Sequence, residues 1–159
     1  MLRRNVIFLA VVIALRTYGS AADSWRATHC DPQETAEASG IRIISEKGAE
    51  LLRVCQDGAL VPQTGFVSVT SDHRADFLLV TQVGAKLREA TLYRKSGAQY
   101  VRVGWWSGWD IRAVRWHDRP AIHYEELQPT LDHRRNVVYF TWNGSRLVAD
   151  RAAEVSFHE

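Results

Sequence analysis

The sequence predicts a mainly β protein, with one small antiparallel β-sheet or sandwich-like domain behind a short irregular or helical N-terminal segment. Three observations predict it. Short apolar or alternating runs recur between clusters of turn residues at a spacing of roughly eight to fifteen positions, which is typical of all-β chains. The composition, 46% hydrophobic and 24% charged, is that of a folded globular protein and excludes a disordered chain. The length of 159 residues fits one domain.

The N-terminal residues have the pattern of a secretory signal peptide. Arg3 and Arg4 precede an unbroken apolar stretch over residues 6–15, and small residues that suit signal peptidase follow it. A membrane-spanning helix needs about 20 apolar residues, which this stretch does not reach. We therefore expect residues 1–22 to be a signal peptide and residues 23–159 to be a single exported domain, periplasmic or secreted, with no stable membrane insertion after cleavage.

The net charge argues against a nucleic-acid partner. The whole chain carries a formal charge of +2, but three arginines and no acids lie within the expected signal peptide. Their removal makes the balance slightly negative, whereas proteins that bind nucleic acids concentrate positive charge.

Cys30 and Cys55 are expected to form a disulfide. Both cysteines follow the signal peptide, and an oxidising compartment favours pairing over a free thiol. A catalytic thiol and a metal pair are the alternatives, but Cys55 has no base near it in sequence and no C-x-x-C motif occurs. The bond would stabilise the fold by about 3 kcal/mol in the chain-entropy model.

The first elements after the signal are short. Residues 22–40 are polar and contain Pro32, and residues 33–39 could form one or two helical turns. Residues 50–55 fit either a strand or a helix face, and the Glu46-Lys47-Gly48 turn before them favours a strand.

Two later segments predict strands of different kinds. Residues 66–70 alternate between apolar and polar side chains, so one side of that strand should face water. The Ser71-Asp72-His73-Arg74 sequence is expected to turn the chain. Residues 77–80 are continuously apolar, which suits a central strand covered on both faces.

Residues 121–126 alternate in a way that assigns side chains to faces. Ile122 and Tyr124 should point to one side of the strand, and His123 and Glu125 to the other. Neighbouring Glu125 and Glu126 therefore cannot cooperate as a pair of carboxylates in a regular strand.

The last predicted element is a β-hairpin. Asn143-Gly144 lies between two apolar runs, at residues 137–142 and 146–149. Because Asn-Gly tolerates positive φ angles, we expect a two-residue type I′ turn there.

The most unusual segment contains four of the six tryptophans. Trp105 and Trp106 are neighbours between Gly104 and Gly108, so in a regular strand they must face opposite ways. Exposed tryptophan and arginine are the residues most enriched at interface hot spots, whereas buried ones would simply fill the core. We therefore expect a binding surface formed by Trp105, Trp106, Trp109, Arg112, Arg115 and Trp116.

Histidines and acids offer an alternative, a metal or general-base site. His117-Asp118 and His123, joined by His133, could come together, and Asp110 or Glu125 could supply a carboxylate for a hydrolase. No H-x-x-x-H, H-E-x-x-H or G-x-S-x-G motif occurs. We therefore expect no metal and no cofactor.

Together these features favour a small, exported, non-enzymatic binding protein. Its expected partner is another exported or envelope protein, as for an inhibitor or immunity-type factor. A cell-wall or carbohydrate-binding module that uses the tryptophans on peptidoglycan or polysaccharide is the alternative, followed by a metal-assisted hydrolase.

Overall fold

The computed structural model describes residues 23–30, 40–70, 76–126, 134–151 and 155–156, and within these ranges the chain forms strands and no helix. All strand pairs are antiparallel. The predicted mainly β class is therefore confirmed. The expected signal peptide lies outside the described ranges, and the division into a signal and one domain stays a prediction. No described helix has the length and apolar character needed to cross a membrane.

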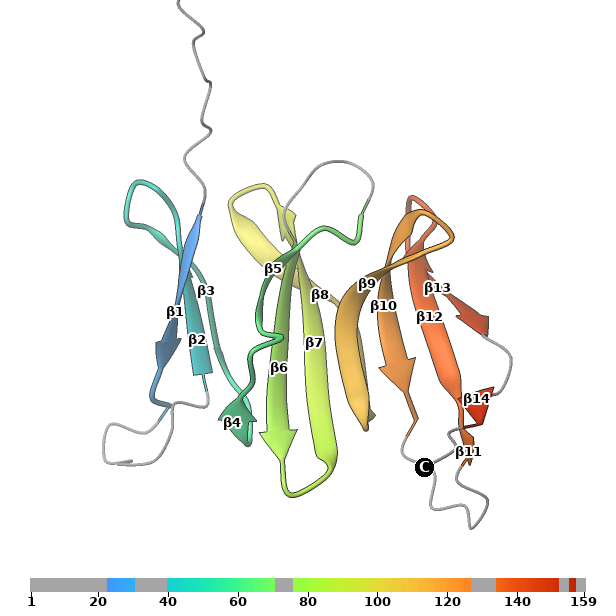
Figure 1. Cartoon of the computed structure of the whole chain (residues 1–159). Helices are drawn as coiled ribbons and strands as arrows, with labels where there is room; N and C mark the ends of the chain where they lie inside the picture. The colour runs from blue at the N-terminus through green and yellow to red at the C-terminus, as the bar shows by residue number, and fades with distance from the viewer. Residues whose placement is uncertain (1–22, 31–39, 71–75, 127–133, 152–154, 157–159) are drawn as a thin grey trace, which may run out of the picture.

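Three larger sheets stand side by side (Figure 1). The first has the order β1-β2-β3, with β1 Ser24–Thr28, β2 Gly40–Ile44 and β3 Glu50–Cys55. The middle sheet has the order β4-β6-β7-β8 with β5 also paired to β6, and its strands are β4 Ala59–Leu60, β5 Gly65–Val67, β6 Asp76–Val83, β7 Leu87–Ser96 and β8 Gln99–Gly108.

The third sheet has the order β13-β12-β10-β9. Its strands are β9 Asp110–Trp116, β10 Arg119–Glu125, β12 Val137–Trp142 and β13 Leu147–Arg151. A separate two-stranded pair joins β11 Arg134–Arg135 to β14 Val155–Ser156.

Two apolar cores separate the three layers, and β6 contributes to both. Phe77 and Leu79 pack with Ile41 and Ile43 of the first sheet. The alternate side chains of β6, Leu78 and Val80, pack on the opposite face in the second core. That core consists of Val69, Leu78, Val80, Ala90, Leu92, Trp106, Ile111 and Ile122. The continuously apolar run at 77–80 therefore is a central strand covered on both faces, as predicted, and each of its four side chains is fully buried.

The strand predicted at residues 66–70 ends early. Strand β5 stops at Val67, and Thr70 is buried although it was expected to face water, whereas Val69 is buried and Ser68 exposed as the alternation predicts. The reason is Asp76, whose Oδ2 accepts hydrogen bonds from the backbone N–H groups of Val69 and Thr70, both at 3.0 Å. A side chain thus replaces the missing strand partner. The turn expected at residues 71–74 lies outside the described ranges.

The hairpin predicted near Asn143-Gly144 is present, but its type I′ turn is not. Asn143 N–H donates to the Arg146 carbonyl at 3.1 Å, and only Gly144 has a positive φ. The Asn143 side-chain oxygen instead accepts from the N–H groups of Ser145 and Arg146. Asn143 therefore closes the loop by a side-chain hydrogen bond to the backbone and not by adopting a positive φ angle; asparagine favours turns in both ways.

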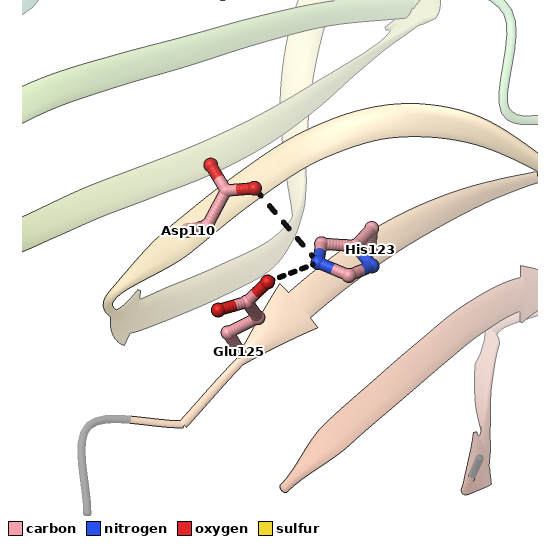
Figure 2. Close-up of side chains that lie close together, drawn as sticks. All are labelled: Asp110, His123 and Glu125. Atoms are coloured by element: carbon pink, nitrogen blue, oxygen red, sulfur yellow. Dashed lines mark hydrogen bonds and ion pairs between the residues drawn. The ribbon is translucent and has the colours of Figure 1, made fainter. Parts of the chain in front are cut away.

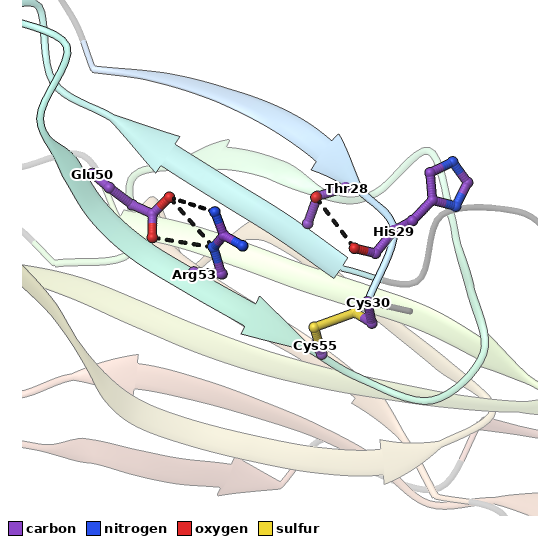
Figure 3. The surroundings of a disulfide bond; sticks show 6 residues. All are labelled: Thr28, His29, Cys30, Glu50, Arg53 and Cys55. Carbon is purple, nitrogen blue, oxygen red and sulfur yellow. Dashed lines mark hydrogen bonds and ion pairs between the residues drawn. A yellow bond between two sulfur atoms is a disulfide. The ribbon is translucent and has the colours of Figure 1, made fainter. Parts of the chain in front are cut away.

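The N-terminal segment begins with a strand, contrary to the expected irregular or helical conformation. Strand β1 pairs along its whole length with β2, and residues 33–39, where a helical turn was predicted, lie outside the described ranges. The predicted strand at residues 50–55 is confirmed as β3. Figure 3 shows the predicted Cys30–Cys55 disulfide, which links the chain after β1 to the end of β3 across a Cα separation of 5.7 Å.

Candidate functional site

Trp105 and Trp106 point to opposite faces of β8, as alternation requires. Trp106 is 7% exposed and packs against Phe140 of the third sheet, with ring centroids 5.4 Å apart. Trp105 is 54% exposed. The structure thus places one ring in the core and leaves the other free for a contact, so Trp106 offers no exposed ring to a partner.

The two glycines flanking this pair make room for buried rings. A Cβ at Gly104 would lie 2.8 Å from Leu147 Cδ1 and would also collide with the Trp106 ring. A Cβ at Gly108 would lie 2.6 Å from Tyr124 Cε2. Tyr124 donates its hydroxyl to the Ser107 carbonyl at 3.1 Å, and burial raises the pKa of this tyrosine. The glycines therefore allow β8 to pack closely on the third sheet.

The other members of the expected binding surface do not share one face. Trp109 follows β8 and has the Lys86 ammonium 5.2 Å from its ring centroid. Arg112 and Trp116 lie on one face of β9, whereas Arg115 has the opposite parity and donates to the Asp118 carbonyl at 2.8 Å. Tertiary structure thus separates Trp105, Trp106 and Arg115 from the face that carries Arg112 and Trp116.

That face is the outer side of the third sheet, opposite the core. On β10 it carries His123 and Glu125, and the β9 residues directly across from them are Arg112 and Asp110. On the other side of β10, Tyr139 of β12 lies across from His123. The prediction that Ile122 and Tyr124 face away from His123 and Glu125 is confirmed, since Ile122 lies in the core and Tyr124 packs against it.

Asp110, His123 and Glu125 form a compact cluster, shown in Figure 2 and called here the outer-face cluster. His123 Nε2 lies 3.1 Å from Glu125 Oε1 and 3.8 Å from Asp110 Oδ2. One ligand atom from each of the three residues falls within 4.8 Å of the others. His123 is 5% exposed and Glu125 is 8% exposed, so this polar strand face is buried rather than wet.

Two arginines complete the charge balance around Asp110. Arg88 Nη1 lies 2.6 Å from Asp110 Oδ1, in a pair that is partly shielded from water. Arg112 Nε lies 3.3 Å from Asp110 Oδ2, and about half of its side chain is exposed. Asp110 therefore has one oxygen fixed by Arg88 and directs the other toward His123.

Aromatic rings line the next part of the same face. The Tyr139 ring meets the His123 ring edge to face at 5.3 Å, and the Trp116 ring stacks on Tyr139 at 3.7 Å. Trp116 Nε1 donates to Asp150 Oδ2 at 2.9 Å. Trp116 thus supports the ring that orients His123.

The site proposed from sequence included two residues that lie elsewhere. His117 and Asp118 have positive φ angles of 46° and 60° and form the two-residue loop between β9 and β10. This is the type I′ pattern, for which glycine and asparagine are the usual residues. His117 is exposed and is not part of the outer-face cluster, and His133 lies outside the described residues.

The sequence suggested His117 and His123 with either Asp110 or Glu125 for a hydrolase, but it did not bring Asp110, His123 and Glu125 together as one set. The alternation at residues 121–126 already placed His123 and Glu125 on one face of the strand. Glu126 points away and accepts a hydrogen bond from Asn136 at 3.0 Å. Asp110 joins the cluster only through the register of β9 against β10, which no local pattern specifies.

Comparison of the chain with protein-family models, with curated proteins and with solved structures gave no match. The chemistry of the cluster therefore stands on its geometry. An imidazole beside two carboxylates can exchange protons or hold a divalent ion. The small exposure of His123 and Glu125 limits the size of anything that could reach them.

Proposed function

We propose that the protein is an exported binding protein that recognises another exported or envelope protein, in the manner of an inhibitor or immunity-type factor. The observation that carries this proposal is the Trp105 ring, which is 54% exposed on the long strand β8. Large exposed aromatic rings are the commonest anchors of protein interfaces. Val101 on the same strand is 43% exposed, and the register shift of β8 between the two residues places it on the other face of the sheet.

The position of β8 in its sheet favours a polypeptide partner. Strand β8 pairs with β7 on one side, and within the described part of the chain no strand pairs with its other edge. An unpaired edge offers backbone N–H and C=O groups to an extended segment, which a polysaccharide cannot match in a regular ladder. An added strand would lie beside Trp105 and Val101.

Export is supported by the signal-like N-terminus and by the Cys30–Cys55 pair, because disulfides persist mainly in oxidising compartments. The disulfide lies at the end of the first sheet, on elements other than β8. It would therefore stabilise the fold of an exported protein without shaping the proposed contact surface.

An affinity capture with wild-type and Trp105→Ala protein tests the proposal. The oxidised protein is immobilised, exposed to envelope extract, and its captured partners are quantified by mass spectrometry. We expect one stoichiometric protein that binds the wild type, with an affinity reduced at least about 30-fold by Trp105→Ala, as the loss of a 2 kcal/mol hot spot requires.

Val148→Ala provides the matched control, because Val148 is 39% exposed on the third sheet and alternates with Leu147, the β13 residue whose side chain lies against β8. It should bind the partner as the wild type does. Equal capture by Trp105→Ala would overturn the assignment of this surface. Sedimentation with peptidoglycan or polysaccharide, without any protein partner, would replace the proposal with the carbohydrate-binding alternative.

A further inference from the structure

The outer-face cluster brings one imidazole and two carboxylates close enough together to hold a metal ion. Both carboxylates approach the same atom, His123 Nε2, which has a single proton to donate when it carries one. Glu125 and Asp110 are also directly opposite each other on paired strands. Like charges in that position repel, and a nearby cation offsets the repulsion, as Arg88 and Arg112 do at Asp110.

Two of the three ligand-atom separations are close to those found around a small divalent ion. With bonds of about 2.0–2.2 Å to nitrogen and oxygen, neighbouring ligands of a tetrahedral zinc ion are about 3.3 Å apart. The observed separations of 3.1 Å and 3.8 Å from His123 Nε2 lie on either side of that value. The chosen ligand atoms of all three residues lie within 4.8 Å of one another, so the two carboxylates would move closer together when an ion binds.

The scaffold fixes these atoms through regular backbone pairing. His123 and Glu125 are two residues apart on β10, and Asp110 is the register partner of Glu125 on β9. Strands hold side chains more rigidly than loops, which favours a preorganised ligand set. The contacts behind the ligands serve the same purpose: Arg88 holds the second oxygen of Asp110, and Tyr139 packs on the His123 ring.

Arg112 would compete with a metal ion for Asp110. Its Nε lies 3.3 Å from Asp110 Oδ2, the oxygen that would become the ligand. About half of the Arg112 side chain is exposed, so it can turn into water when an ion binds. This competition gives the proposal a distinctive consequence, because removing the arginine should strengthen ion binding, whereas a purely structural cluster would only lose a favourable contact.

We propose that Asp110, His123 and Glu125 bind one divalent first-row transition-metal ion, with a further coordination position left for water. One imidazole nitrogen and two carboxylate oxygens suit Zn²⁺ and its neighbours in the series. This site is independent of the proposed partner surface around Trp105, so either assignment can fail without the other.

Calorimetric titration with Zn²⁺ tests the site. The full oxidised protein, purified without a histidine tag and stripped with EDTA, should bind one ion. His123→Gln and Asp110→Asn should each weaken binding by on the order of 100-fold or more, since each removes a ligand. Arg88→Gln should weaken it about 10-fold by freeing Asp110, and Arg112→Gln should tighten it.

His117→Asn is the matched control. It removes a histidine only six positions away, on the loop of the same hairpin, and asparagine accepts the positive φ found there. This variant should bind Zn²⁺ as the wild type does. Circular dichroism of each variant confirms that a loss of binding does not reflect unfolding.

Substitution with Co²⁺ keeps the test decisive if His123→Gln fails to fold. The wild-type complex should show d–d absorption that Glu125→Gln removes and His117→Asn leaves unchanged. The proposal is overturned if the wild type binds no ion, if a folded His123 or Asp110 variant binds as tightly as the wild type, or if Arg112→Gln weakens binding.

Discussion

Strands β6 and β10 are both buried on two faces, but by different means. In β6 both faces are apolar, and side chains such as Phe77 and Leu78 fill the two cores. In β10 only the face with Ile122 is apolar, and the opposite face buries His123 and Glu125. The comparison shows that an alternating strand need not face water, because charged groups can be buried when their partners lie on the neighbouring strands.

The largest effect should come from the apolar strand. Phe77→Ala removes a fully buried ring that meets Trp25 and Phe66 edge to face, at 5.6 Å and 5.3 Å. We expect the free energy of unfolding to fall by about 3–5 kcal/mol, because the layer between the first and middle sheets cannot close the cavity. Urea denaturation measures the change, and a loss below about 1 kcal/mol would contradict the two-core description.

The polar face of β10 should be less sensitive. His123→Leu keeps the volume of the side chain but leaves Asp110 and Glu125 without the imidazole nitrogen between them. We expect the free energy of unfolding, measured in EDTA, to fall by about 1–3 kcal/mol. This is the usual cost of leaving a buried polar group without its hydrogen-bond partner. Denaturation in EDTA measures the cluster without any ion. If His123→Leu were more stable than the wild type, the buried polar face would be less favourable for folding than an apolar face in the same place.

The stabilities of wild type and His123→Leu can also be compared after Zn²⁺ is added. Binding to the folded state alone raises the free energy of unfolding. Wild-type protein should therefore become more stable with Zn²⁺, and His123→Leu should not.

Arg88→Gln should have a smaller effect on the same face. The Arg88–Asp110 pair at 2.6 Å is partly shielded from water, so its loss should cost about 1 kcal/mol at low salt. The difference from wild type should shrink in 1 M salt, since screening weakens the partly exposed pair. A difference that does not depend on salt would indicate a packing role for the arginine stem instead.

The subtlest test concerns Asp76, the buried carboxylate at the start of β6. Burial raises the pKa of this carboxyl group, although Val69 and Thr70 donate backbone hydrogen bonds to it. The folded state therefore keeps a proton that the unfolded state loses. Its contribution to stability falls as pH rises from the ordinary aspartate pKa through the raised one.

Asp76→Asn removes that pH dependence while keeping an oxygen for the two N–H groups. The stability of the variant relative to wild type should rise with pH across this acidic window and level off above it. Denaturation at a series of pH values measures the difference. Glu50→Gln serves as a control whose pH dependence should have the opposite sign, because the hydrogen bond from Arg53 lowers the pKa of Glu50. A stability difference between Asp76→Asn and the wild type that did not change with pH would contradict the raised pKa of Asp76.

Local patterns predicted much of the fold. The apolar run at residues 77–80, the strand at 50–55 and the opposite faces of Trp105 and Trp106 follow from side-chain alternation and from turn residues nearby. The errors arose where a distant group intervened. Asp76 replaced a strand partner for Thr70, and β2 drew residues 24–28 into a strand that their own sequence did not indicate.

The candidate site was less predictable for the same reason. The sequence suggested His123 with Asp110 or Glu125 as its carboxylate, but it added His117, the nearest histidine, as the other member of the site. Hairpin geometry sends His117 into the loop and brings Asp110 across from Glu125. Neighbours on a strand are fixed by a period of two, whereas neighbours across strands depend on register.

The sequence by itself determined the all-β class, the pairing of the two cysteines and the faces of the strands, because these follow from local periodicity and a single disulfide option. Tertiary structure decided that three sheets stack around two cores, that Trp106 is buried while Trp105 is exposed, and that Asp110, His123 and Glu125 meet. These outcomes depend on contacts between residues far apart in the chain, where packing and register, rather than local preference, set the free energy.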